Sequence, residues 1–400
     1  MRVKLGDICE IVGGSTPKSN VPEYWDGNVK WITPAELNED SYVLYDSVRK
    51  ITELGAQKTG LNSFPAGTVI LSSRAPIGKV AIAGCEMYCN QGFKNLICSD
   101  AINNKYLYWF LKGKTAYLNS LGRGATFKEI SKQIVANIEI DLPPIERQSE
   151  IAAQFEIIAS VLRHHHELLS TLDDLIKARF VEMFGAINET VPLSYYIESL
   201  TAGKSLAGEV ECLNKVLKTG AATYDYFDPT QVKNLPKDYE PVAEHQLHDG
   251  DIIISRMNTA ELVGAAAYVW IAPAHTYLPD RLWRAELREC VNPIFVWQAI
   301  VQPTTKEAIR KIAGGTSGSM KNISKPGLLS IHVKKVSVEM QNDFAAFVSQ
   351  VNKSKFIWAS PIRLTPIPHI IIQAKKQISL PDFKSFNHKQ SQGGDPRDQL

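Results

Sequence analysis

The strongest constraint on the fold is an internal repeat, because a chain that carries the same blocks twice is expected to build the same domain twice. Phe127–Lys132 reads FKEISK, and Met320–Lys325, 193 residues later, reads MKNISK. The same offset aligns Gln148 with Gln341. The 400 residues therefore predict two related domains, each long enough to bury its own core.

A second repeated block indicates what the domains contain. Gly67–Arg74 parallels Gly250–Arg256 with one residue missing, and in each block a turn glycine precedes an apolar run, Thr68–Leu71 or Ile252–Ile254. A helix is expected over Lys105–Leu118, where apolar side chains share one face. Each half thus predicts a mixed, strand-rich domain with a few helices, and the fold class is α+β.

A long helix is predicted between the two halves. From Ile145 to about Met183 apolar residues recur at alternating spacings of four and three, a heptad pattern that favours a partner helix along most of its length. Gly185 is a suitable stop, and about 38 residues give a rod of ~57 Å, longer than one turn of DNA. The predicted seam comprises Ile151, Phe155, Ile158, Leu162, Leu169, Leu172 and Ile176.

A similar helix is predicted to start at Val338 and to end near Trp358, because prolines follow at 361, 366 and 368. The predicted organisation is therefore a first domain over residues 1–144, a spacer helix over 145–185, a second domain over 186–337, a shortened helix over 338–358 and a Pro-containing polar tail over 359–400. We expect the tail to be poorly ordered.

The charge balance leaves the kind of partner open. Lys and Arg number 44 against 42 Asp and Glu, a net charge of +2, and DNA binding requires local basic patches rather than a basic total. The six cysteines form no CxxC pair and no apolar leader follows Met1, so we expect a cytoplasmic protein with free thiols.

Signatures of catalysis and of metal binding are missing from the sequence. It holds neither a GxxxxGK[ST] phosphate loop nor the Asp/Asn-Pro-Pro-aromatic motif of adenine methyltransferases. His164-His165-His166 cannot converge on one ion, because consecutive helical residues point in different directions. The sequence thus offers no candidate catalytic residue, metal ligand or cofactor site, which agrees with a chain that binds while other proteins carry out a reaction.

Basic residues beside the repeated blocks are the candidate DNA contacts. Arg74 and Arg256 each follow a predicted strand at what the alignment makes equivalent positions, where they could pair with guanine, hold a phosphate or form a salt bridge within the protein. Arg281 and Arg284 flank Trp283, which suits stacking and backbone contact but also a core tryptophan with exposed neighbours.

Two glycine-rich loops supply further candidates. The repeat sets Gly122-Arg123-Gly124 opposite Gly315-Thr316-Ser317, and Lys128 and Lys321 follow these loops at equivalent positions. Glycine lets backbone amides approach a phosphate closely, although simple turns would use the same residues. Lys18 and Lys94 are additional candidate contacts.

Several blocks together resemble the specificity subunit of type I restriction-modification enzymes. They are Leu5-Gly6-Asp7-Ile8, Gly13-Gly14-Ser15-Thr16-Pro17, Trp31-Ile32-Thr33-Pro34, Leu71–Gly78, Asn90-Gln91-Gly92-Phe93-Lys94, Gly124–Ile130 and Leu142-Pro143-Pro144 with Gln148. The resemblance covers roughly residues 1–356 and is carried by the order and repetition of these blocks around the heptad helix.

The resemblance implies a partner set and a division of labour. Two target-recognition domains would each read one half of a bipartite site in double-stranded DNA, and the helices would set their spacing and dock the modification subunits. Those subunits would bind S-adenosylmethionine and methylate adenine, and a separate motor and nuclease subunit would use ATP and magnesium.

Two other functions are kept beside this one. Since the sequence after Phe356 departs from the family's second helix, the chain could be a truncated silent or decoy subunit that occupies its partners without reading DNA. An independent enzyme acting on DNA, such as a nuclease, is the third reading.

Overall fold

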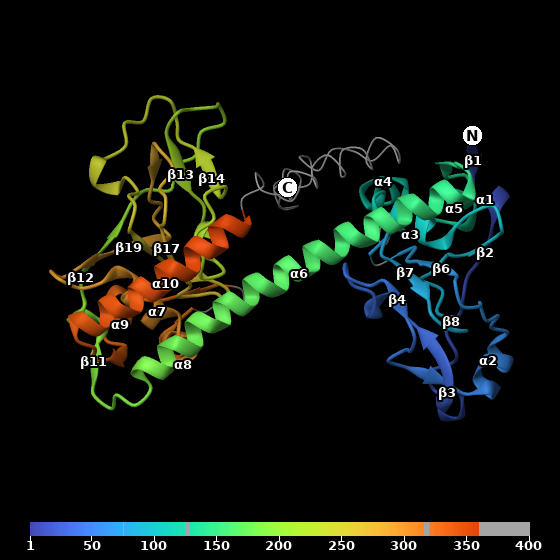
Figure 1. Ribbon diagram of the computed structural model, residues 1–400, viewed down its shortest axis with the longest axis horizontal. Helices are drawn as coiled ribbons and strands as arrows, with labels where there is room; N and C mark the ends of the chain where they lie inside the picture. Colours follow the sequence, from blue (N-terminus) through green and yellow to red (C-terminus); the bar gives the residue numbers. More distant parts are fainter. Residues whose placement is uncertain (75, 125–127, 316–319, 360–400) are drawn as a thin grey trace, which may run out of the picture. The chain divides into compact units, whose positions relative to one another are not determined.

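The computed structural model describes residues 1–74, 76–124, 128–315 and 320–359, with the side chains of the last helix described as far as Lys355 (Figure 1). These residues fall into two compact units, 1–164 and 165–359. Helix α6 (Ile145–Phe184), of 40 residues, belongs to both units and is the helix predicted between the halves. The predicted tail, apart from Ala359, and the tips of both glycine-rich loops lie outside the described residues.

The first unit combines a five-stranded and a three-stranded sheet with short helices. Its strands are β1 (Arg2–Lys4), β2 (Cys9–Val12), β3 (Trp25–Ile32), β4 (Val43–Leu44), β5 (Lys50–Ile51), β6 (Val69–Leu71), β7 (Val80–Ala83), β8 (Tyr88–Cys89), β9 (Asn95–Cys98) and β10 (Glu139–Asp141). Its helices besides α6 are α1 (Leu5–Ile8), α2 (Glu53–Thr59), α3 (Asn104–Lys112), α4 (Thr115–Leu121) and α5 (Lys132–Ala136).

The second unit is built from corresponding elements. Its strands are β11 (Thr190–Pro192), β12 (Ile197–Ala202), β13 (Lys215–Leu217), β14 (Val232–Asn234), β15 (Ile252–Ser255), β16 (Met257–Asn258), β17 (Ala266–Tyr268), β18 (Thr276–Tyr277), β19 (Leu282–Leu287), β20 (Lys321–Asn322) and β21 (His332–Lys334). Its helices are α7 (Pro293–Val301), α8 (Pro303–Ile312), α9 (Lys325–Leu329) and α10 (Val338–Ala359).

The sheet topology shows that the two units are copies of one fold. The strand order β2-β9-β6-β7 of the first unit recurs as β12-β19-β15-β17, and the first unit adds β4 at the edge. Each unit also has a small sheet, β5-β3-β8 or β14-β13-β18, whose central strand has one antiparallel and one parallel neighbour. The predicted α+β class with repeated domains is confirmed.

A buried glutamine ties each unit to its C-terminal helix. Gln148, at the start of α6, is fully buried, and its Oε1 accepts from the backbone N–H of Asn103, the residue that caps α3. Gln341, in α10, accepts in the same way from Asn292, which caps α7. The repeat at these positions therefore preserves a structural hydrogen bond, since a buried amide without partners is costly.

Each end of α6 belongs to the core of one unit. In the first unit the ring of Phe155 stacks on Trp109 with centroids 5.6 Å apart. In the second unit Phe180 contacts both Phe295 and Phe344, so α7 and α10 pack on the same part of α6 (Figure 1). The ends of the predicted seam are thus covered within the units, and Leu162 between them is 45% exposed.

One predicted helix differs from the structure, whereas the shortened helix predicted over 338–358 is present as α10. The helix predicted over Lys105–Leu118 is two helices, α3 and α4, because the chain leaves the helical path at Gly113 and Lys114. Helix α10 has 22 described residues, little more than half the length of α6. No described helix is long and apolar enough to cross a membrane.

Candidate nucleic-acid interface

In the first unit the carboxylate of Glu129 lies close to two of the candidate cations, Arg74 and Lys94. Glu129 Oε1 lies 3.0 Å from Lys94 Nζ, and Glu129 Oε2 lies 4.0 Å from Arg74 NH1. Lys94 Nζ also lies 3.3 Å from Ser73 Oγ. We call Ser73, Arg74, Lys94 and Glu129 the β6 corner, because Ser73 and Arg74 lie just beyond the end of that strand. Its charges sum to +1 at neutral pH, and the Lys94 side chain is only 16% exposed.

Backbone hydrogen bonds fix the loop that carries Glu129. Arg123 and Glu129 exchange a pair of N–H···O bonds of 3.0 Å, and the N–H of Ile130 donates to Ser73 O at 3.0 Å. Arg123 and Lys128 are both exposed on this loop. Three sequence-predicted cations, Arg74, Lys94 and Arg123, are thereby brought to one place, with Lys128 next to Glu129.

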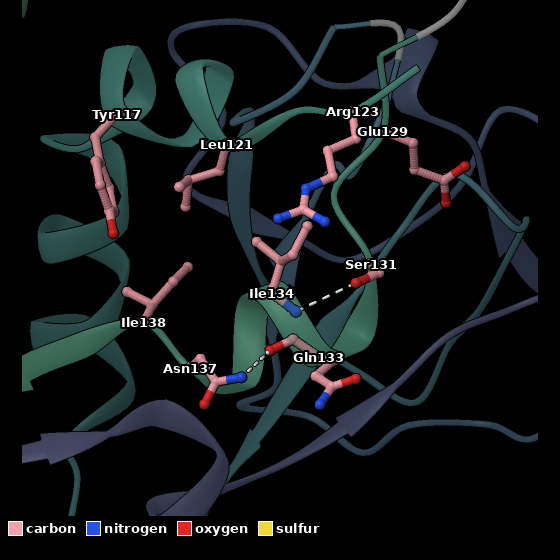
Figure 2. A pocket seen from close by; sticks show the side chains of 9 residues that line it. All are labelled: Tyr117, Leu121, Arg123, Glu129, Ser131, Gln133, Ile134, Asn137 and Ile138. Carbon is pink, nitrogen blue, oxygen red and sulfur yellow. Dashed lines mark hydrogen bonds between the residues drawn. The ribbon is translucent and has the colours of Figure 1, made fainter.

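A surface pocket of about 460 Å³ opens beside this loop. Figure 2 shows the Arg123 guanidinium directed into it while the Glu129 carboxylate points away. The pocket floor holds Ser131, whose Oγ accepts from the N–H of Ile134 and so caps α5. Its lining residues are Tyr117, Leu121, Arg123, Glu129, Ser131, Gln133, Ile134, Asn137 and Ile138.

The second unit carries the same corner with other side chains. Ile323 N–H donates to Arg256 O at 3.0 Å, as Ile130 does to Ser73, so Arg256 is the counterpart of Ser73. Met257 pairs with Asn322 as Arg74 pairs with Glu129. We call Arg256, Met257, Trp283 and Asn322 the β15 corner.

The pairing of β19 places the fourth member. Leu282 stands opposite Ser255 as Phe93 stands opposite Ser72, so the next residue, Trp283, is the counterpart of Lys94. The Arg256 guanidinium carbon lies 5.9 Å from the centroid of the Trp283 ring. The pair Ser73 and Lys94 of the first unit is therefore replaced by Arg256 and Trp283 in the second.

Two alignments made from the sequence are wrong. Arg74 and Arg256 are not equivalent: the blocks align without a gap, so the counterpart of Arg74 is Met257. Arg123 does not match the Gly315-Thr316-Ser317 block either, because Gly314 exchanges hydrogen bonds with Asn322 as Arg123 does with Glu129. The second loop is two residues longer between these partners, which a single offset of 193 cannot represent.

The remaining sequence-predicted residues lie in different settings. Arg281 and Lys18 are exposed, and Lys321 Nζ is 3.4 Å from Gly315 O. Arg284 is only 12% exposed, with Nε 2.8 Å from Glu286 and NH1 2.9 Å from the carbonyl oxygen of Gln246. Its other contacts are the carbonyl oxygen of Glu244 and the carboxylate of Asp251.

Arg284 thus has partners for its donors inside the second unit. Burial raises the pKa of its neighbour Asp251, although the backbone N–H of His248 and the charge of Arg284 oppose that rise. Trp283 is a core residue, as the alternative for the Arg–Trp block held, but that alternative expected exposed arginines and Arg284 is nearly buried. We therefore leave Arg284 out of the interface proposed below. The sequence analysis did not identify Glu129 as a site residue. The signal that could have found it is the difference between the two repeats, since FKEISK has Glu129 where MKNISK has Asn322.

No group of three His, Cys, Asp or Glu residues among the described residues is placed to hold a metal ion. The described cysteines are all free thiols.

Comparison with known proteins gives a consistent result. Residues 1–173 match the family described as "Type I restriction modification DNA specificity domain". The chain is 36% identical over 222 residues to the MjaIX specificity subunit of Methanocaldococcus jannaschii, a match that covers 54% of this chain and 51% of that protein. It is 23% identical over 257 residues to the EcoKI specificity subunit of Escherichia coli, covering 58% and 55%. The chain therefore spans about half the length of the curated relatives it matches.

Solved structures share the fold over nearly the whole chain. A type I restriction-modification S subunit from M. genitalium superposes with a TM-score of 0.54 at 14% identity, covering 96% of each chain. A chain from a study of complex assembly and conformational transition in the type I R-M system gives 0.53 at 16% identity, covering 94% of this chain and 95% of that one.

Proposed function

Because residues 1–173 match the type I restriction-modification DNA specificity domain, we propose that the chain is a specificity subunit that selects a bipartite DNA sequence for partner subunits that carry out the chemistry. Each unit would read one half of the target. The observation that supports this best is one corner built twice on the same backbone, with different side chains in the two copies. Two readers of different half-sites require that combination of constant frame and variable surface.

The proposed DNA faces surround the two corners. In the first unit Arg74, Lys94, Arg123 and Lys128 gather around the β6 corner, and Lys18 is a further candidate. In the second unit the face comprises Arg256, Arg281 and Lys321. Cations at an interface position the phosphate backbone, and an arginine at a groove edge can also read guanine.

The helices are the proposed docking surface for modification subunits. Exposed apolar side chains recur on one side of α6, at Ile157 (64%), Leu168 (51%) and Leu175 (45%). Such a stripe on a helix favours a protein partner. In this assembly S-adenosylmethionine would be bound by the modification subunits, ATP and magnesium by a motor and nuclease subunit, and the complex would act in the cytoplasm. We assign residues 1–144 and 186–337 as the recognition domains.

The test is a map of adenine methylation at single-base resolution in cells that express this chain with a modification subunit encoded beside it. We expect a gapped, two-part methylated motif that is absent when the chain is omitted. A matched comparison carries Arg74→Ala, which should alter only one half of the motif. A methylation pattern that is the same with and without the chain contradicts the proposal.

A decoy subunit is the second candidate, and the sequence after Phe356 favours it. Prolines at 361, 366 and 368 are unfavourable inside a helix, so this sequence is unlike a second helix of the length of α6. A decoy would co-purify with modification subunits and still produce no new methylation. Co-purification together with a new methylated motif rejects this candidate.

A further inference from the structure

The β6 corner contains its own anion. Glu129 lies within 3.0 Å of Lys94 Nζ and within 4.0 Å of Arg74, so one carboxylate serves two cations. Ser73 adds a hydroxyl next to Lys94. A half-buried cation is stabilised by a nearby carboxylate because removing it from water without a partner is costly.

The β15 corner holds a cation at the same place without that anion. Asn322 stands where the first unit has Glu129, and Arg256 and Trp283 stand where it has Ser73 and Lys94. Arg256 Nε and Trp283 Nε1 are buried and have no hydrogen-bond partner among the residues that the structure describes. Trp283 is only 2% exposed. These groups donate and cannot accept, so the corner is short of an acceptor.

The surroundings add positive charge. The N–H of Arg256 donates to the carbonyl oxygen of Arg281, whose side chain is exposed, and Lys321 precedes Asn322 in β20. The acid next to Arg281 in the chain, Asp280, already accepts from the hydroxyl of Ser205. The positive charge of the β15 corner and its unpaired hydrogen-bond donors therefore both favour binding of an anion from outside the unit.

We propose that the β15 corner is an anion site that binds a phosphate group, and that Glu129 occupies the corresponding site of the first unit from within. Arg256 would hold the phosphate oxygens, with its guanidinium resting on the Trp283 ring. The natural occupant, a phosphodiester of the DNA backbone, rests on the function proposed above. The two units would then grip DNA unequally, with a permanent phosphate contact at this corner only in the second.

The test uses the full chain and measures its binding to a labelled duplex over a range of salt concentrations. Asn322→Glu gives the second unit the carboxylate of the first, and Arg256→Gln removes the cation. Each is expected to lower the slope of log K against log salt by about one unit, alike on all DNA sequences. Because both changes act on one phosphate, the double variant should lose no more than either single one.

Controls separate this site from general charge effects. Lys335→Gln changes the net charge by the same amount, one residue after the end of β21, and should leave the slope nearly unchanged. Arg256→Lys keeps the charge and should keep the slope. Melting temperatures of all variants identify one that fails to fold, and Asn322→Glu alone then carries the test, since Asn322 is exposed.

Two outcomes on DNA overturn the proposal. One is a salt slope that is the same in Asn322→Glu and Arg256→Gln as in Lys335→Gln. The other is a loss of affinity confined to one DNA sequence, which would make Arg256 a base reader.

If the unaltered chain binds no DNA, the proposed function fails, and inorganic phosphate becomes the probe. A rise in melting temperature with phosphate in the unaltered chain but not in Asn322→Glu supports the site with free phosphate as its occupant. An equal rise in both, or none, overturns it.

Discussion

The side-chain oxygen of Gln148 accepts a hydrogen bond of 2.8 Å from the backbone N–H of Asn103, and it does so in a fully buried position. Gln148 Nε2 donates to the carbonyl oxygens of Ala101 and Pro143. Gln341 in the second unit bonds to Asn292 N–H and to the carbonyl oxygen of Val336. In each copy one amide thus joins the cap of a core helix to the start of the next long helix.

Replacing either glutamine with alanine is expected to destabilise its own unit by about 3 kcal/mol, because buried backbone groups lose their partners. Urea unfolding of Gln148→Ala followed by fluorescence should show an earlier transition for the first unit, and Gln341→Ala an earlier one for the second. Gln57→Ala, at an exposed position in α2, is the matched control. Equal midpoints for Gln148→Ala and Gln57→Ala would show that the amide is dispensable.

The contact between α6 and the rest of the first unit at Glu156 is expected to contribute a pH-dependent part of the free energy of unfolding. Burial of this carboxyl opposes ionisation, but hydrogen bonds from Lys105 and Tyr42 outweigh it and lower the pKa of Glu156. Lys105 Nζ lies 2.8 Å from Glu156 Oε1. A carboxyl with a lowered folded-state pKa stabilises the fold above its unfolded pKa of about 4.3, and this stabilisation is lost as the pH falls through the folded value.

Glu156→Gln should therefore cost about 1 kcal/mol at neutral pH, the scale of a partly exposed charged hydrogen bond. The difference from the unaltered chain should shrink as the pH falls below about 4. The measurement is the urea midpoint of the first unit as a function of pH. Glu10→Gln removes a carboxylate from an exposed position in β2 and should give a flat difference. A Glu156→Gln difference that grows toward low pH would reverse the assigned sign.

The architecture could be predicted from the sequence because it depends on features that repeat or recur periodically. The heptad spacing from Ile145 predicted α6, and the shared FKEISK and MKNISK blocks predicted two copies of one fold. Gln148 and Gln341 aligned correctly because both copies need the same buried hydrogen bonds. Patterns of this kind are imposed by burial, which acts on many residues together.

The corners could not be predicted because each depends on a few side chains brought together by strand pairing. An assumed one-residue gap aligned Arg74 with Arg256, whereas the hydrogen bonds of the two units make Arg256 the counterpart of Ser73. Glu129 looked like one surface acid among many, and its contact with Lys94 spans 35 residues of sequence. The sequence made Arg284 a candidate DNA contact, but in the structure its guanidinium donates to backbone carbonyl oxygens of the same unit.

Arg74 is expected to affect one half of the target only. Its counterpart in the second unit is Met257, which has no charge, so no equivalent contact exists there. Arg74→Ala should weaken or relax reading of a single half-site by ~1–3 kcal/mol if the guanidinium touches a base. The measurement is the methylation map of the variant, with Met257→Ala as the matched change in the other unit. An unchanged motif and unchanged affinity would remove Arg74 from the interface.

Glu129 should limit how strongly the first unit binds DNA. Its carboxylate lies beside Lys94 and Arg74, so Glu129→Asn, which installs the residue of the second unit, leaves both cations without their internal anion. Binding to duplexes of any sequence should strengthen, and the slope of log K against log salt should steepen by about one unit, since one more phosphate is neutralised. Fluorescence anisotropy at several salt concentrations measures both effects. Glu10→Asn changes the net charge equally at another exposed strand position and should have a smaller effect. Weaker binding by Glu129→Asn, in a variant that melts at the temperature of the unaltered chain, would mean that the carboxylate orients Lys94 and Arg74 for DNA and does not compete with it.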